Sequence, residues 1–144
     1  MVTSRSIRSY RELIAWQRAM ELVVVSYRTA SRLPRDELYG LVSQIRRAAT
    51  SVPANIAEGQ GRRGTGEFLH HLGIANGSLF ELETHVLAAT RLGMIDEQHA
   101  KPCLDLTAEV GRILAGLMRR LTNKGASPGR RSPLAPGHRP LATS

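Results

Sequence analysis

The sequence predicts an all-α protein whose chain forms an antiparallel, up-down-up-down four-helix bundle. In four successive segments, apolar residues recur at alternating spacings of three and four, which is the period of a helix with one buried face. Short stretches containing glycine or proline join the segments, and short connections favour antiparallel neighbours. No segment shows the alternating pattern of a β-strand. With 144 residues, of which 42% are hydrophobic, the chain is long enough to bury one core.

The first helix is predicted over about residues 10 to 32. Its apolar stripe consists of Leu13, Trp16, Met20, Val23, Tyr27 and Ala30. We expect the segment Leu33–Pro34–Arg35–Asp36 to break this helix. Val23, Val24 and Val25 are consecutive, and successive helical residues are turned by about 100°. At least one of the three is therefore predicted to point outward.

The second helix is predicted to follow Asp36, which can cap its N-terminus. Its stripe consists of Leu38, Leu41, Ile45, Ala48, Val52 and Ile56. Pro53 lies inside this helix, where a proline removes one backbone donor at a cost of about 3 kcal/mol. We expect a kink at Pro53, with polar atoms of Ser51, Asn55 and Glu58 near the freed carbonyls and neighbouring arginines.

The third and fourth helices follow a glycine-rich turn. The third is predicted to begin with Thr65 as its N-cap and to stop at Gly93, a residue type that favours helix C-termini. The fourth begins near Asp96, and its Pro102 is tolerable if it lies in the first turns. The two stripes consist of Phe68, Leu72, Ala75, Leu79, Leu82, Val86 and Ala89, and of Cys103, Thr107, Val110, Leu114, Leu117 and Leu121.

The two ends of the chain differ from the bundle predicted over residues 10–121. Residues 1–9 form a basic N-terminal arm, and residues 122–144 are rich in proline, glycine and arginine, which predicts a disordered basic tail. The chain has 20 basic and 12 acidic residues and a formal charge of +8. Six of the basic residues and none of the acidic ones lie in these ends, so the bundle itself carries only +2. A nucleic-acid site on the bundle therefore requires a local cluster, and Arg46–Arg47 and Arg62–Arg63 are the candidates.

Apolar residues also occur outside the four stripes. Besides the valine run, they are Ile14, Leu69, Phe80, Leu106, Ile113 and Met118. Single apolar residues scattered on a surface are normal. The apolar surface that these residues provide, however, exceeds what an isolated bundle of four helices needs. It therefore predicts an interface between subunits.

Three patterns that could indicate catalysis or cofactor binding lack the required context. Residues 59–64 fit the letters of a dinucleotide-binding motif, but they follow a helix where that motif requires a strand. Glu67 and His70 have the spacing of one half of a di-iron site, and no second copy is present. The remaining histidines have no partner that the sequence can locate, and Cys103 on a core stripe is expected to be a small buried hydrophobe. We predict no enzymatic activity, cofactor or metal.

The cellular setting is predicted from two absences in the sequence. A single cysteine permits no intramolecular disulfide and favours a reducing compartment. The sequence also has no apolar leader and no apolar run long enough to cross a bilayer. We therefore expect a cytoplasmic protein that does not associate with membranes.

Several motifs together resemble the bacterial four-helix-bundle family first met as proteins encoded in intervening sequences of 23S ribosomal RNA genes. They are Trp16–Gln17, Tyr39–Leu41, Gln44–Ala49, Ser51–Gly59, Glu67–Phe68, Gly77–Thr84 and Val110–Leu114. The resemblance covers about residues 10 to 121, and the tail lies outside it. It implies a small cytoplasmic helical bundle that assembles as a homopentamer. A related branch comprises the accessory variability proteins of diversity-generating retroelements, which contact nucleic acid and a reverse transcriptase.

The resemblance also implies a polar signature without a catalytic role. Its residues are Arg46, Arg47, Asn55, Glu58, Arg63, Glu67, Glu81 and Glu83. Two interpretations of the first two arginines stay open. Arg46 and Arg47 either form ion pairs with Glu81 or Glu83 on the third helix, or they belong to an exposed anion-binding patch.

These observations favour a non-enzymatic, oligomeric accessory protein that binds structured RNA or DNA through a basic surface. The predicted nucleic-acid contacts are Arg46, Arg47, Arg62 and Arg63. Few aromatic residues are present, so stacking on single-stranded bases is poorly supported, and phosphate contacts are expected instead. One alternative is a protein–protein interaction scaffold in which the arginines are structural. The other is an accessory subunit of a retroelement reverse transcriptase.

Overall fold

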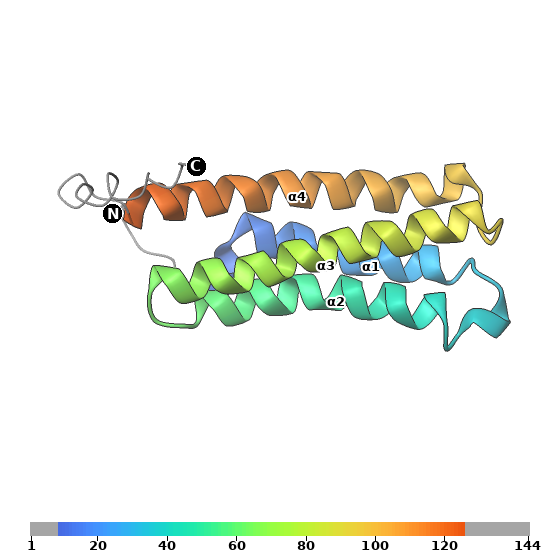
Figure 1. Cartoon of the computed structure of the whole chain (residues 1–144), viewed down its shortest axis with the longest axis horizontal. Coiled ribbons are helices and arrows are strands. Elements are labelled where there is room, and N and C mark those ends of the chain that lie inside the picture. The colour runs from blue at the N-terminus through green and yellow to red at the C-terminus, as the bar shows by residue number, and fades with distance from the viewer. Residues whose placement is uncertain (1–8, 126–144) are drawn as a thin grey trace, which may run out of the picture.

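The computed structural model describes residues 9–125, and these form an all-helical bundle (Figure 1). The four long helices are α1 (Ile14–Ala30), α2 (Leu41–Gln60), α3 (Thr65–Arg91) and α4 (Glu97–Gly125), and the short 3-10 turns are η1 (Tyr10–Glu12) and η2 (Arg35–Glu37). The chain reverses direction at each connection between the long helices, as the predicted up-down-up-down order requires. Each long helix packs against its neighbours in the chain, and α4 packs against α1. The four helices thus close around a single core.

The core stripes predicted for α2, α3 and α4 are largely confirmed. Their fully buried large side chains include Ile45, Ile56, Leu72, Leu82 and Leu114. Cys103 is also fully buried, as expected of a small core residue. At the ends of the stripes the agreement weakens, because Leu38 is 44% exposed and Leu41, Phe68 and Leu121 are only partly buried.

The predicted core face of α1 is wrong by about one residue. Met20 and Tyr27 are exposed, whereas the buried residues are Ala15, Ala19, Leu22, Ser26, Thr29 and Ala30. This stripe has the same alternating spacing but contains mostly small side chains. Small residues allow close approach of neighbouring helices, and the larger Trp16 and Leu13 pack at the margin of the core.

Helix boundaries differ from the predictions at three N-termini. The helix α1 begins at Ile14, after the 3-10 turn η1, and not near residue 10. Asp36 does not cap α2, because η2 and Gly40 intervene and the Glu37 carboxylate accepts a hydrogen bond of 3.1 Å from the Leu41 amide. The N-cap of α3 is Gly64, and Thr65 is the first helical residue. At α4 the prediction is confirmed, since Asp96 accepts a hydrogen bond of 2.8 Å from the His99 amide.

The predicted end of α3 at Gly93 is also confirmed. The helix stops at Arg91, and Gly93 adopts a φ of 75°, a conformation that glycine reaches without strain. Its amide donates to the Thr90 carbonyl, and the Met94 amide donates to the Ala89 carbonyl.

Both internal prolines lie within continuous helices. Pro53 is buried in α2, and Pro102 is exposed in the second turn of α4. The bend expected at Pro53 stays a prediction.

The ends of the bundle extend slightly beyond the predicted limits. Ser9, assigned to the N-terminal arm, caps η1 through its side chain. Residues 122–125, assigned to the tail, continue α4. The rest of the predicted arm and tail, residues 1–8 and 126–144, lies outside the described residues.

The apolar residues outside the predicted stripes differ in their exposure. Ile14, Val24 and Phe80 are 60%, 50% and 62% exposed, which confirms that part of the valine run and of this set points outward. Leu106 is buried at 9% exposure, contrary to its placement outside the core. Ile113 and Met118 are partly buried and pack against the core.

Candidate nucleic-acid interface

The two arginine pairs predicted as nucleic-acid contacts lie at opposite ends of the bundle. Arg46 and Arg47 lie in the second turn of α2, near the α1–α2 connection, whereas Arg62 and Arg63 lie in the turn between α2 and α3. At a rise of about 1.5 Å per residue, the two pairs are separated by roughly 20 Å along α2. They do not form one contiguous site.

The antiparallel fold instead brings other cations to the turn that carries Arg62 and Arg63. Figure 1 shows this turn and the end of α4 at the same end of the bundle. The last two turns of α4 carry Arg119, Arg120 and Lys124. All five of these side chains are exposed. We call the set of Arg62, Arg63, Arg119, Arg120 and Lys124 the basic end.

Only one cation of the basic end has an acidic partner within residues 9–125. Arg62 Nη2 donates a hydrogen bond of 2.8 Å to Glu58 Oε2, which raises the pKa of Arg62 and lowers that of Glu58. The other four form no ion pair in the part of the chain that the structure describes. Four positive charges at this end are therefore available to an anionic partner.

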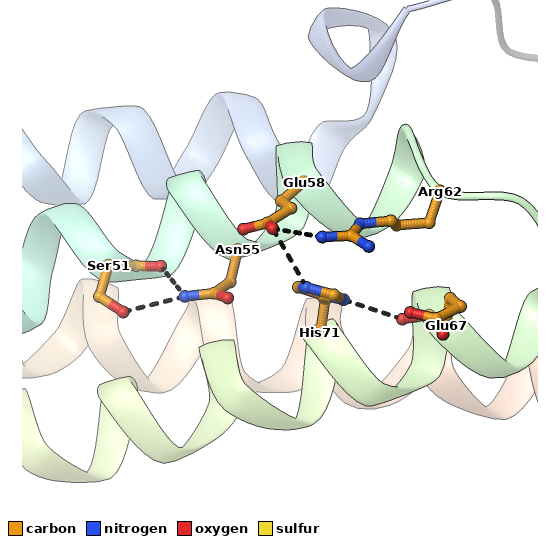
Figure 2. A network of polar contacts seen from close by, with 6 residues as sticks. All are labelled: Ser51, Asn55, Glu58, Arg62, Glu67 and His71. Carbon is orange, nitrogen blue, oxygen red and sulfur yellow. Dashed lines mark hydrogen bonds and ion pairs between the residues drawn. The ribbon is translucent and has the colours of Figure 1, made fainter.

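Glu58 links the basic end to the packing of α2 on α3. Figure 2 shows its carboxylate between Arg62 and His71, with His71 Nε2 at 3.5 Å from Glu58 Oε2. The other ring nitrogen, Nδ1, is 3.1 Å from the Glu67 carbonyl oxygen, which can only accept. The ring thus lies between the Glu67 carbonyl oxygen on one side and the Glu58 carboxylate on the other.

The polar residues around Pro53 form a second group in Figure 2. Asn55 Nδ2 donates to the Ser51 carbonyl at 2.9 Å and to Ser51 Oγ at 3.1 Å. Ser51 Oγ also lies 2.7 Å from Ser78 Oγ of α3. Asn55 thus binds the carbonyl of Ser51, whereas the proline frees that of Ala49. Asn55, which follows the proline, therefore binds Ser51, the residue whose hydroxyl contacts Ser78 of α3.

Gly59 has a structural role at a close contact between α2 and α3. A Cβ atom built at this buried position would lie 2.7 Å from the Cβ of His71 and 3.0 Å from a ring carbon of Phe68. Those distances are shorter than packed side chains tolerate. Position 59 thus requires glycine for packing, and the dinucleotide-like pattern of residues 59–64 consists of the end of a helix and a turn.

Arg46 is partly buried and turned towards α1. Its guanidinium lies 5.0 Å from the centroid of the Tyr27 ring, a distance typical of a cation–π contact. Its Nε is buried and has no hydrogen-bond partner among residues 9–125. Arg47, the next residue, is exposed.

The ion pairs expected between these arginines and α3 are absent from the described part of the chain. No ion pair there joins Arg46 or Arg47 to Glu81 or Glu83, and both glutamates are exposed. The guanidinium of Arg46 instead lies over the ring of Tyr27 of α1. The main ion pair between helices was not predicted: Arg18 of α1 donates two hydrogen bonds of 2.9 Å to Glu109 of α4.

The histidine and acidic side chains do not gather into a metal site within residues 9–125. Glu67 and His70 are both exposed on the first turns of α3. None of the helices that the structure describes combines the length and the apolar character needed to cross a membrane.

Comparisons with known proteins agree with this fold. A sequence model of the family described as 23S rRNA-intervening sequence protein matches residues 11–116. Among solved structures, a protein with unknown function from the S23 ribosomal protein family of Bacteroides thetaiotaomicron VPI-5482 is similar, with a TM-score of 0.68 at 20% identity. The match covers 74% of this chain and 96% of that one. No curated protein matches this sequence.

Proposed function

Because the chain belongs to the 23S rRNA-intervening sequence protein family, we propose that it is a non-catalytic, oligomeric accessory protein of the cytoplasm that binds structured RNA through its basic end. The observation that carries the proposal is the gathering of five exposed cations from the α2–α3 turn and α4, four of them without an acidic partner in the described residues. Phosphate contacts by such side chains supply most of the affinity of a binder without strong sequence preference.

The aromatic residues favour a structured RNA over a single strand. The most exposed rings are Tyr39 at 91% and Phe80 at 62%, and neither belongs to the basic end. Without aromatic platforms among the cations, stacking on unpaired bases contributes little. Helical RNA, by contrast, is bound mainly through its phosphates, its 2′-hydroxyls and its shape. This arrangement predicts salt-sensitive binding with weak sequence selectivity.

The experiment compares two variants of the full chain that lose the same charge. The first replaces Arg63, Arg119, Arg120 and Lys124 with glutamine. The matched control replaces four exposed arginines at the opposite end: Arg28, Arg32, Arg47 and Arg91. Fluorescence anisotropy with a labelled RNA hairpin is measured over a range of salt concentrations.

We expect the first variant to bind the RNA hairpin more weakly. The slope of the logarithm of the binding constant against the logarithm of the salt concentration should become shallower by up to about three, since each lost phosphate contact reduces it by roughly 0.7 to 0.9. The control should retain most of the affinity. Equal losses in both variants would show that only net charge matters and would refute the site. A further variant ending at Gly125 separates any contribution of residues 126–144 from that of the bundle.

A second candidate function is a protein–protein interaction scaffold, and the exposed apolar side chains favour it. Met20 and Tyr27 are exposed on α1, while Phe80 and Leu87 are exposed on α3. The helices α1 and α3 lie at diagonal positions of the bundle and do not contact each other. Two separate apolar faces allow one copy to pack on the next, and a closed ring of copies results if the rotation closes. The homopentamer implied by the family resemblance is one such assembly.

Light scattering after size exclusion tests this second candidate. The scaffold predicts an oligomer that Phe80→Ser and Leu87→Ser dissociate without unfolding the helices. A wild-type monomer at micromolar concentration would exclude a self-assembling scaffold. Loss of RNA binding together with the oligomer would indicate that the two candidate functions depend on one another.

A further inference from the structure

A second cationic site lies at the end of the bundle opposite the basic end. Here α1, η2 and α2 enclose an open cavity of about 490 Å³. Its apolar lining includes Leu33, Pro34, Leu38 and Val42, and its charged lining consists of Arg35 and Arg46. Among the residues that the structure describes, no acidic side chain lines the cavity. We call it the Arg35–Arg46 pocket.

The state of Arg46 indicates that this pocket lacks a counter-charge. Its Nε is buried and has no hydrogen-bond partner, and the guanidinium forms no ion pair within the described residues. A buried donor that has lost water without gaining an acceptor is unfavourable, and for a charged group the loss is greater. The cation–π contact with Tyr27 compensates for this loss on one face of the guanidinium only. Because Arg46 lines the pocket, an anion bound there would supply a counter-charge to its guanidinium group.

The neighbouring acidic residues do not supply this charge. Asp36 and Glu37 follow Arg35 in η2, but neither lines the pocket. The Glu37 carboxylate instead accepts a hydrogen bond from the Leu41 amide at the start of α2. Both lining arginines therefore lack an acidic partner in the described part of the chain.

We propose that the Arg35–Arg46 pocket binds a small amphipathic anion, a carboxylate or phosphate group attached to a short apolar body. The anionic group contacts the two guanidinium groups, which present donors suited to either oxyanion. The apolar body covers Leu33, Leu38 and Val42. A pocket of this size, lined mostly by apolar residues and by two arginines, is of the type that small ligands occupy. The site is independent of RNA binding, because it lies at the other end of the bundle.

Equilibrium dialysis of radiolabelled octanoate against the full chain tests the proposal in any oligomeric state. We expect saturable binding with a dissociation constant of about a millimolar or below, given the small size of the ligand. Unlabelled octanoate should compete, whereas 1-octanol, which lacks the charge, and acetate, which lacks the chain, should compete poorly. Octyl phosphate in the same assay shows which anionic group is preferred.

Variants at adjacent positions make the test specific. Arg46→Gln and Arg35→Gln should each weaken octanoate binding by about tenfold, the effect expected from losing one charge-assisted contact. Arg47→Gln is the matched control, because Arg47 is exposed and does not line the pocket. Leu38→Glu, at a half-exposed position, places a carboxylate beside the arginines and should abolish binding even if the arginine variants are less stable.

Three results would overturn the proposal. One is the absence of saturable octanoate binding to the wild-type chain. The second is competition by 1-octanol equal to that of octanoate, which would indicate an apolar surface without anion recognition. The third is displacement of octanoate by one equivalent of the RNA hairpin, which would assign these arginines to the nucleic-acid site. Failure of RNA binding alone leaves the dialysis result unaffected, so the two proposals are tested separately.

Discussion

Gly59 and His71 lie at a close contact between α2 and α3, where a Cβ atom at position 59 would lie only 2.7 Å from the Cβ of His71. The same α3 position carries the imidazole that faces Glu58 and contacts the Glu67 carbonyl. One short interval of α2 thus supplies both the close packing against α3 and the carboxylate that partners Arg62 of the basic end.

Gly59→Ala should destabilise the bundle by about 2 kcal/mol, because overpacking a buried contact outweighs the helix propensity gained with alanine. Gly73→Ala is the matched control. Gly73 also lies within a helix, but a Cβ there meets nothing within 4 Å. We expect the control to be neutral or to stabilise by up to about 1 kcal/mol. Urea unfolding measures both, and equal stability of the two variants would contradict the packing account.

Glu58→Gln should strengthen RNA binding by a few-fold and increase its salt dependence. The substitution removes the carboxylate that pairs with Arg62 and leaves that guanidinium free for a phosphate. Glu97→Gln, at an exposed position in the opposite half of the bundle, makes the same change in net charge and serves as the control. Anisotropy titrations compare them, and an identical gain in both variants would mean that Arg62 has no specific role.

Glu109→Gln should reduce stability at neutral pH and have little effect in acid. The hydrogen bonds from Arg18 hold the pKa of Glu109 below its ordinary value. A lowered carboxyl pKa stabilises the fold fully above the pKa of the unfolded state, and this contribution is lost as the pH falls through the folded pKa.

Thermal melting of wild-type protein and Glu109→Gln at several pH values checks this expectation. The difference in melting temperature should be largest near neutral pH and should disappear at pH values below the folded pKa. Glu21→Gln is the control, since Glu21 contacts Arg18 from the same helix and its loss leaves the pair between α1 and α4 in place. A difference that persists unchanged in acid would exclude the ion pair as its source.

Cys103 should react slowly with thiol reagents in the folded protein at neutral pH. Its side chain is fully buried, and burial raises the pKa of the thiol, so the reactive thiolate is rare. Ellman's reagent should label it rapidly only after unfolding in guanidinium chloride. Rapid labelling of the native protein would show that the contact between α1 and α4 opens readily, because Cys103 lies 3.5 Å from Ser26 across that contact.

The sequence by itself determined the helices and most of the core faces, because helical periodicity is local information. The stripes of α2, α3 and α4 could be identified from residues such as Ile45, Leu82 and Leu114. The end of α3 before Gly93 and the start of α4 after Asp96 follow from backbone and capping preferences. The motifs around Pro53 also carried the resemblance to the family that residues 11–116 match.

Only the tertiary structure decided which side of α1 is buried and where the cations gather. The sequence of α1 contains two apolar stripes, and the buried one contains Ala15 and Ala19, whereas Met20 of the other is exposed. Which stripe is buried depends on how closely the neighbouring helices pack. The basic end includes Arg63 and Arg119, far apart in sequence, because antiparallel packing places the α2–α3 turn and the end of α4 at the same end of the bundle. The contact of Arg46 with Tyr27 likewise depends on the packing of α2 against α1. Such relations arise from contacts between distant segments, which local periodicity does not contain.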